Sequence, residues 1–295
     1  MGLPNINITF YTLAKAAAAH GGKGVLCVLL EDTAATGEYV IHSAADIPTG
    51  LSAANRTYLE RGLTGNATAP EKILCKVLSS TTEDISDGLR WAELQTFDYL
   101  AGPPDIASSD ATAVAAWIKD QRAAGRKSKA VLPDTAADSE GVVNFSASGL
   151  KDANGSITAA AYCSRIAGIL AGTPFTQSAT YVELPELTDA ARLSRDEADA
   201  AVDAGKSIVW YDGRKFKTGR AVNSLTTLTG KSAAYQKIKI IEVMDLIRED
   251  ITLTAEDQFI GKYPNSYDNR CLLISAVKGY LENLAADGIL GADPA

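Results

Sequence analysis

Apolar and polar positions follow two different periods along the middle of this chain. Between Val25 and Leu170, short apolar runs of strand length alternate with longer segments whose apolar positions have helical spacing. We predict strands at residues 25–31, 39–43, 72–78, 97–100, 130–132 and 142–145, and helices at 52–61, 82–94, 111–124 and 158–170. Strands that alternate with helices predict an α/β fold, with a mostly parallel sheet and helices on its faces.

The pattern changes in the segment 172–187, which contains glycine, two prolines and polar residues. We place a domain boundary there. Beyond it we predict a helix at 195–204 and strands at 207–211 and 215–222, which are joined by Asp212 and Gly213. An Asp-Gly pair is a hairpin signal, because the turn requires a positive φ that glycine adopts without steric cost.

The last part of the chain predicts a long helical hairpin. A first helix starts near Tyr235 and carries an apolar stripe and an acidic stripe, as amphipathic helices do. The apolar stripe is Ile240, Met244, Ile247 and Ile251, and the acidic stripe is Glu242, Asp245 and Glu249. Pro264 interrupts the helical pattern, Ser266 is a suitable N-cap for a second helix, and Gly288 is a suitable stop. Residues after the boundary therefore predict an α+β domain.

A short strand is predicted at the N-terminus, ahead of the sheet. Ile6, Ile8 and Phe10 point to one face of it, and Asn5, Asn7 and Thr9 point to the other. An alanine-rich linker separates this strand from the rest, so it must pair within its own sheet or extend the sheet edge of a neighbour. We therefore divide the chain into an extended N-terminal arm and linker (1–23), an α/β domain (24–175) and a C-terminal domain (176–295).

Composition and charge exclude several classes of function. The chain is 46% apolar and 22% charged, as globular proteins are, and its formal net charge is -8 with no basic run. Such a chain lacks the clustered Lys and Arg that nucleic acid or an anionic membrane requires, so we expect neither as a partner. Four scattered cysteines, Cys27, Cys75, Cys163 and Cys271, form no metal-binding spacing, and we expect buried free thiols.

The residues that suggest catalysis or cofactor binding have simpler structural explanations. Gly230-Lys231-Ser232 resembles the end of a phosphate-binding loop, but the first glycine of that motif would fall at Leu225, so we interpret the triplet as a turn. His20 and His42 have no neighbouring nucleophile motif. The acids at 196–199 suit the first turn of a helix. We therefore expect no catalytic residue, cofactor or metal, although an α/β enzyme with an unrecognised site stays as an alternative.

Five basic residues are candidates for protein contacts; three lie in the predicted β-hairpin and two at the start of the long helix. They are Lys215, Lys217, Arg220, Lys237 and Lys239. The first three lie along one predicted strand, where alternation places charges mostly on one face, and a solvated strand edge would explain them equally well. The alternative is a charged patch that meets an acidic neighbour.

Three segments of the C-terminal region carry a resemblance to a known family. Residues 219–227, 238–251 and 259–290 resemble the C-terminal region of contractile tail sheath proteins, in particular the short sheath type of Gram-positive phages and prophage-like particles. The N-terminal opening is also similar, and the middle matches only in its α/β alternation. Sheath proteins of this kind typically continue past the position of Ala295 with a further strand, so we expect this sequence to be cut short there.

The resemblance implies a mechanical role. A sheath subunit polymerises with copies of itself into helical stacked hexameric rings around a tail tube, and contraction then drives the tube through the target envelope. Its other partners would be the tail tube, baseplate and tail terminator proteins, with no cofactor, and its place would be the virion tail after assembly in the host cytoplasm. Residues Asn5 to Phe10 would act as an intersubunit arm. The five basic residues would act as sheath-domain contacts that meet an acidic neighbour or the inner tube. A sheath of a non-phage contractile injection system is the alternative.

Overall fold

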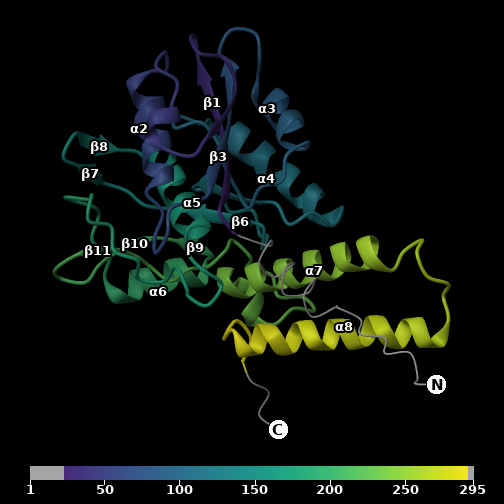
Figure 1. The fold of residues 1–295 in the computed structure, drawn as a ribbon. Helices are drawn as coiled ribbons and strands as arrows, with labels where there is room; N and C mark the ends of the chain where they lie inside the picture. Colours follow the sequence, from purple (N-terminus) through teal and green to yellow (C-terminus); the bar gives the residue numbers. More distant parts are fainter. Residues whose placement is uncertain (1–22, 292–295) are drawn as a thin grey trace, which may run out of the picture. The chain divides into compact units, whose positions relative to one another are not determined.

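A computed structural model describes residues 23–291. Its largest feature is a sheet of seven strands in the order β2-β3-β1-β4-β5-β6-β9, in which every neighbouring pair is parallel except β2 with β3 (Figure 1). The strands are β1 (Val25–Asp32), β2 (Gly37–Ile41), β3 (Lys72–Ser79), β4 (Tyr99–Ala101), β5 (Lys129–Pro133), β6 (Val142–Phe145) and β9 (Lys206–Ser207). The predicted mostly parallel α/β sheet is confirmed.

Helices cover both faces of this sheet. Successive residues of a strand point to opposite faces, so a strand that is apolar throughout needs packing on both sides. On β1, Leu26 and Val28 pack into one core and Cys27 and Leu29 into the other. The first core also contains residues of α2 (Ala53–Leu63) and α5 (Cys163–Ala171), and the second contains residues of α3 (Ile85–Ala92) and α4 (Ser108–Ala123). Short 3-10 turns lie at Ala44–Asp46, Ala160–Tyr162 and Ala233–Gln236.

Two small hairpins and one helix lie beside the large sheet. The hairpins are β7 (Leu150–Asp152) with β8 (Gly155–Ile157) and β10 (Val209–Tyr211) with β11 (Phe216–Thr218), and the helix is α6 (Arg195–Asp203). Gly213 has the predicted positive φ, at 93°. The strand predicted at 207–211 is two strands, because Ser207 pairs with Phe145 while Val209 pairs with Thr218. The β7–β8 hairpin was not predicted.

Helices α2 and α5 cross at two glycines. A Cβ atom on Gly168 would lie 2.1 Å from the carbonyl oxygen of Gly62, far inside the contact limit. Because that oxygen belongs to the backbone, a larger residue can fit only if the helices move apart.

We therefore expect Gly168→Ala to lower the free energy of unfolding by about 1–3 kcal/mol, despite the better helix propensity of alanine. Urea denaturation measures this change. Gly50→Ala is the control, because its new Cβ would meet Ala35 at an ordinary 3.4 Å. Equal stability of the two variants would contradict the proposed close contact.

Two long helices form the predicted hairpin. They are α7 (Ile238–Gln258) and α8 (Tyr267–Ala286), seen in Figure 1 as an antiparallel pair. Ser266 caps α8 by accepting a hydrogen bond from the Asn269 amide, and Gly288 has a φ of 74° after the helix end, as predicted. The hydroxyl of Tyr280 donates to the Asp250 carboxylate at 2.6 Å, which joins the two helices.

Two acids of the predicted acidic stripe of α7 are more buried than the residues of its predicted apolar stripe. Glu242 and Asp245 of the acidic stripe are buried, while Met244 of the apolar stripe is 41% exposed. Buried carboxylates are tolerated where polar partners surround them, as the Asp250–Tyr280 pair illustrates. The periodicity therefore predicted the helix correctly but does not identify its buried side.

The described chain divides into two compact units, residues 23–241 and 242–291. The predicted domain boundary between residues 175 and 176 lies inside the first unit, because β9 extends the sheet formed by earlier strands. The predicted division at residue 175 into two domains that fold independently stays a prediction. The predicted arm, residues 1–23, lies outside the described residues except for Lys23.

Candidate assembly surfaces

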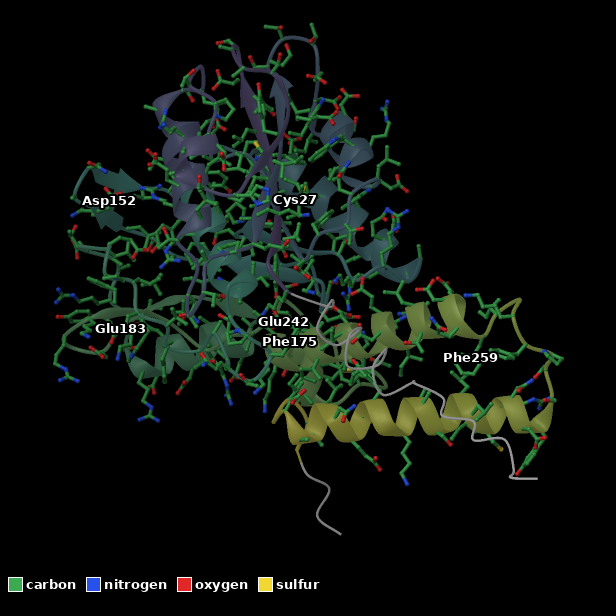
Figure 2. The ribbon with its side chains drawn as sticks, viewed as in Figure 1. Cys27, Asp152, Phe175, Glu183, Glu242 and Phe259 are labelled. Atoms are coloured by element: carbon green, nitrogen blue, oxygen red, sulfur yellow. The ribbon has the colours of Figure 1, made fainter. Side chains whose placement is uncertain are left out.

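The predicted contact cations gather around β11 and the segment that follows it. Lys215 pairs with Glu183 at 2.8 Å and Lys217 pairs with Asp212 at 2.6 Å, so two of the five are neutralised within the chain. Figure 2 shows Glu183 beside the β10–β11 hairpin. Because the Lys215 and Glu183 side chains are both more than half exposed, this pair contributes little to stability.

The other three cations lie on neighbouring backbone segments. Val222 forms a bridge with Lys237, which places the 218–222 segment beside the start of α7. Lys239 donates to the carbonyl oxygen of Thr176 at 2.7 Å. Arg220 and Lys237 are exposed, and within residues 23–291 neither forms an ion pair. Residues 218–222 therefore lie beside the start of α7, and the role of the five cations as contact residues stays a prediction.

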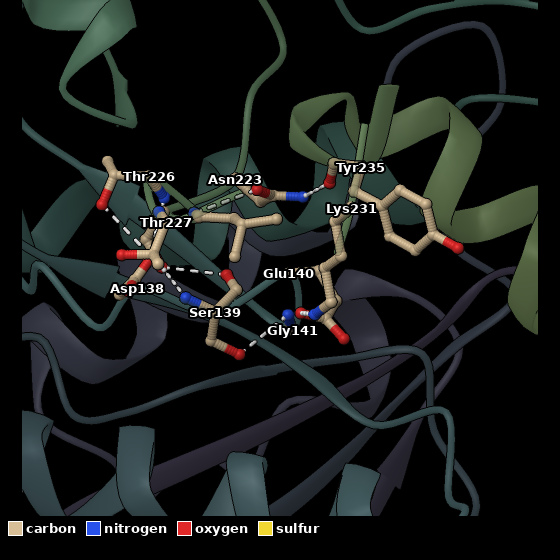
Figure 3. A network of polar contacts seen from close by, with 11 residues as sticks. Asp138, Ser139, Glu140, Gly141, Asn223, Thr226, Thr227, Lys231 and Tyr235 are labelled. Carbon is tan, nitrogen blue, oxygen red and sulfur yellow. Dashed lines mark hydrogen bonds and ion pairs between the residues drawn. The ribbon is translucent and has the colours of Figure 1, made fainter. Parts of the chain in front are cut away.

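A network of polar contacts fixes the segment 219–227 to the loop after β5 (Figure 3). Asn223 is fully buried, and its side-chain amide donates to the Tyr235 carbonyl at 2.7 Å while its oxygen accepts from the Leu225 amide at 3.1 Å. The hydroxyl of Ser224 donates to the Ser139 carbonyl at 3.0 Å. These residues belong to the segment that carries the family resemblance, and their role is to hold the approach to α7.

Asp138 and Lys231 complete this network from the surface. The Asp138 carboxylate accepts hydrogen bonds from the Thr226 and Thr227 amides at 2.7 and 2.8 Å, and Lys231 pairs with Glu140 at 3.0 Å. Gly230 has a φ of 72°, in agreement with the interpretation of residues 230–232 as a turn. The ammonium of Lys231 is thus engaged by a carboxylate within the chain.

The Asp138 contacts predict a specific pH dependence. Hydrogen bonds from the Thr227 and Thr226 amides hold the pKa of Asp138 well below its ordinary value. The stabilisation is therefore complete above the unfolded-state pKa of about 3.9 and is lost as the pH falls through the folded-state pKa. Asp138→Asn cannot titrate, and asparagine tolerates the positive φ at this position. We expect the stability difference between wild type and this variant to shrink as the pH is lowered from 5 towards about 2.

Urea denaturation at a series of pH values measures that difference. Asp120→Asn, at an exposed acid on α4, is the control, and its difference from wild type should change less. A difference between wild type and Asp138→Asn that is constant over the whole range would show that the carboxylate hydrogen bonds do not stabilise the fold.

Exposed large apolar side chains concentrate on the α7–α8 hairpin. Ile260 is 68% exposed, Tyr263 54%, Tyr267 79% and Ile274 66%. Ile260 and Tyr263 lie in the connection between the two helices, and Tyr267 and Ile274 lie in the first half of α8. Several exposed apolar groups on one element are typical of a surface that contacts another protein.

The described residues include no arrangement that identifies a catalytic or metal site. His42 is exposed and its Nδ1 atom lies 3.3 Å from the Glu71 carbonyl oxygen, and no serine of residues 23–291 forms a hydrogen bond with its ring. A cleft of about 600 Å³ lies at the end of β5, lined by alanines together with Lys119, Asp134 and Thr135. Within the same range no group of three acids, histidines or cysteines is placed to hold a metal ion. Cys27, Cys75 and Cys163 are buried free thiols and Cys271 is half-buried.

No helix in the described part of the chain is long and apolar enough to cross a membrane.

The sequence analysis did not identify Tyr181, which is 62% exposed and lies close in the fold to the segment that carries Arg220. Its φ is 59°, a value that side-chain-bearing residues seldom adopt. The surrounding Thr-Tyr-Val reads as an ordinary strand, so no sequence signal marks this residue.

Known proteins match this chain along nearly its whole length. The family models for the phage tail sheath protein central domain and the phage tail sheath C-terminal domain match residues 79–224 and 230–293. A tail sheath protein of Clostridium phage phiCD119 is 39% identical over 300 residues, which cover 99% of this chain and 83% of that protein. The chain therefore belongs to the phage tail sheath protein family, a family of structural tail proteins.

Solved structures share the fold. The crystal structure of a sheath tail protein from Listeria innocua matches with a TM-score of 0.81 and 20% identity, over 95% of this chain and 89% of that one. A chain in the cryo-EM structure of the anti-feeding prophage baseplate matches with a TM-score of 0.67 and 15% identity, over 92% of this chain and 80% of that one. The fold predicted from the sequence is thus one that sheath proteins adopt.

Proposed function

We propose that this sheath protein polymerises with copies of itself into helical stacked hexameric rings around a tail tube, and that the polymer contracts to drive the tube through a target envelope. The observation that carries the proposal is the concentration of exposed apolar residues on the α7–α8 hairpin, inside the segment matched by the C-terminal sheath domain. The same proposal includes the tail tube, baseplate and tail terminator as partners, and assembly in the host cytoplasm.

The proposed mechanism needs no small-molecule energy source. Work comes from the difference in free energy between an extended polymer held by a kinetic barrier and a contracted polymer of lower free energy. Subunits must rotate without separating, and a strand added to a neighbour's sheet edge meets this need because main-chain hydrogen bonds persist while rigid bodies reorient. We assign that role to the predicted arm strand, Asn5 to Phe10. A sheath of a non-phage injection system shares this mechanism, and the genes beside this one distinguish the two.

The hairpin surface can be tested directly. We expect Ile260→Ser combined with Ile274→Ser to leave the melting temperature nearly unchanged, because both side chains are largely exposed. The variant should nevertheless lose polymer, at least about tenfold in the pelleted fraction of the complete gene product, because two contact residues are removed.

Leu94→Ser is the matched control, since Leu94 is 83% exposed and lies outside the hairpin. It should polymerise as wild type does. A double hairpin variant that pellets as wild type would contradict the assignment of this surface to assembly.

A further inference from the structure

Tyr181, Arg220 and Lys237 lie on three adjacent backbone segments. The Tyr181 amide donates to the Thr218 carbonyl at 3.2 Å, which sets residues 180–181 beside the 218–222 segment. Further along the same segment, Val222 forms a bridge with Lys237. We call these three exposed residues, which lie on adjacent backbone segments, the Tyr181 patch.

Tyr181 has a strained backbone whose amide is hydrogen-bonded, but its side chain forms no hydrogen bond within residues 23–291. Asp138 also has a positive φ, but its carboxylate gains the hydrogen bonds described above. Tyr181 instead presents a ring that is 62% exposed, so its strained conformation holds an aromatic group out towards solvent. Strain of this kind, where the surrounding structure enforces it, points to a functional position.

The charges of the Tyr181 patch define the kind of partner that it fits. Arg220 and Lys237 add two positive charges, while the nearby Glu183 is already paired with Lys215 at 2.8 Å. Tyrosine and arginine, with tryptophan, are enriched among the interface residues that dominate binding energies. The patch therefore suits an acidic protein surface that also offers some apolar area for the ring.

Helix α6 carries such a surface on the same chain. Asp196, Asp199 and Asp203 are exposed and spaced i, i+3 and i+7, so they form one stripe along the helix. Glu197 is not part of this stripe, because it completes the capping box with Ser194. Among residues 23–291 this stripe forms one ion pair, between Asp199 and Arg195, and it is weak because the contact is long, at 3.9 Å, and both side chains are largely exposed.

We infer that the Tyr181 patch of one subunit binds the α6 stripe of a second copy, an inference that rests on the proposed function. The two surfaces differ, so the contact is heterologous and adds subunits in one direction, as an open helical polymer requires. Arg220 and Lys237 face the three aspartates, and the Tyr181 ring covers the alanine-rich side of α6. Added salt should weaken the contact, because the charges lie at the surface.

Charge exchange in the complete gene product tests this contact. We expect Arg220→Glu and Asp199→Arg each to raise the critical concentration for polymerisation at least about tenfold, measured by sedimentation. A chain with both substitutions should return to within about threefold of wild type, because the ion pair is restored in reverse.

Tyr181→Asn tests the contribution of the Tyr181 ring, since asparagine also tolerates the positive φ at this position but has no ring. It should melt as wild type does and polymerise at least about tenfold less readily.

Arg90→Glu on α3 is the control charge reversal and should polymerise normally. Single variants that assemble as wild type, or a double variant no better than either single one, would overturn the contact and leave the proposed function standing. A wild-type protein that never polymerises would overturn both.

Discussion

Replacing Arg165 with alanine is expected to lower the free energy of unfolding by about 3–5 kcal/mol, the largest effect of any single substitution that we predict. Arg165 lies on α5 with only 4% of its surface exposed. Its Nε donates to Glu186 at 2.7 Å, and its Nη1 donates to the Gly65 carbonyl. The Tyr162 hydroxyl donates to the same Glu186 oxygen at 2.6 Å. Removing the guanidinium leaves this carboxylate without its counter-charge.

The pKa of Glu186 reports the same balance. Burial alone would raise it, but the Arg165 charge and the Tyr162 hydroxyl outweigh burial and lower it. Urea denaturation of Arg165→Ala measures the stability change, and Arg195→Ala is the control, because the Arg195 side chain is 90% exposed. The control should stay within about 0.5 kcal/mol of wild type. A loss below about 1 kcal/mol for Arg165→Ala would show that the ion pair between buried Arg165 and half-buried Glu186 does not hold residues 183–187 against α5.

Replacing Asn223 with alanine is expected to lower the free energy of unfolding by about 2–4 kcal/mol. Asn223 is fully buried and satisfies two backbone groups, the Tyr235 carbonyl and the Leu225 amide. Alanine removes both hydrogen bonds and leaves those groups away from water. The amide of Leu225 should also exchange its hydrogen faster, which locates the effect at the approach to α7.

Denaturation and hydrogen exchange together measure the Asn223 effect. Asn154→Ala is the matched control, because Asn154 is exposed in the β7–β8 turn and its side chain makes no hydrogen bond among residues 23–291. Unchanged protection of the Leu225 amide in Asn223→Ala would mean that the network in Figure 3 does not depend on this side chain.

Much of the fold was predictable because local patterns agree with it. The apolar run of β1 and the helical spacing of α4 predicted both their type and the parallel sheet. The β7–β8 hairpin was missed because Gly155-Ser156 and its neighbours carry almost no apolar signal. The split of β9 from β10 was missed because the pairing partners lie in distant segments.

The candidate surfaces were less predictable, for a physical reason. The sequence indicated five cations, but only the folded chain shows that Lys215 meets Glu183, which lies 32 residues away. Asn223 lay in the segment that resembles sheath proteins, yet its role depends on Tyr235 and on burial. Tyr181 was missed because backbone strain has no compositional signal outside glycine and asparagine positions.

Electron microscopy of the purified complete gene product tests self-assembly most directly. We expect long tubes made of stacked rings with six-fold symmetry, which shorten and widen when they contract. Particles that stay monomeric, or that close into a two-fold symmetric dimer at every concentration, would contradict it.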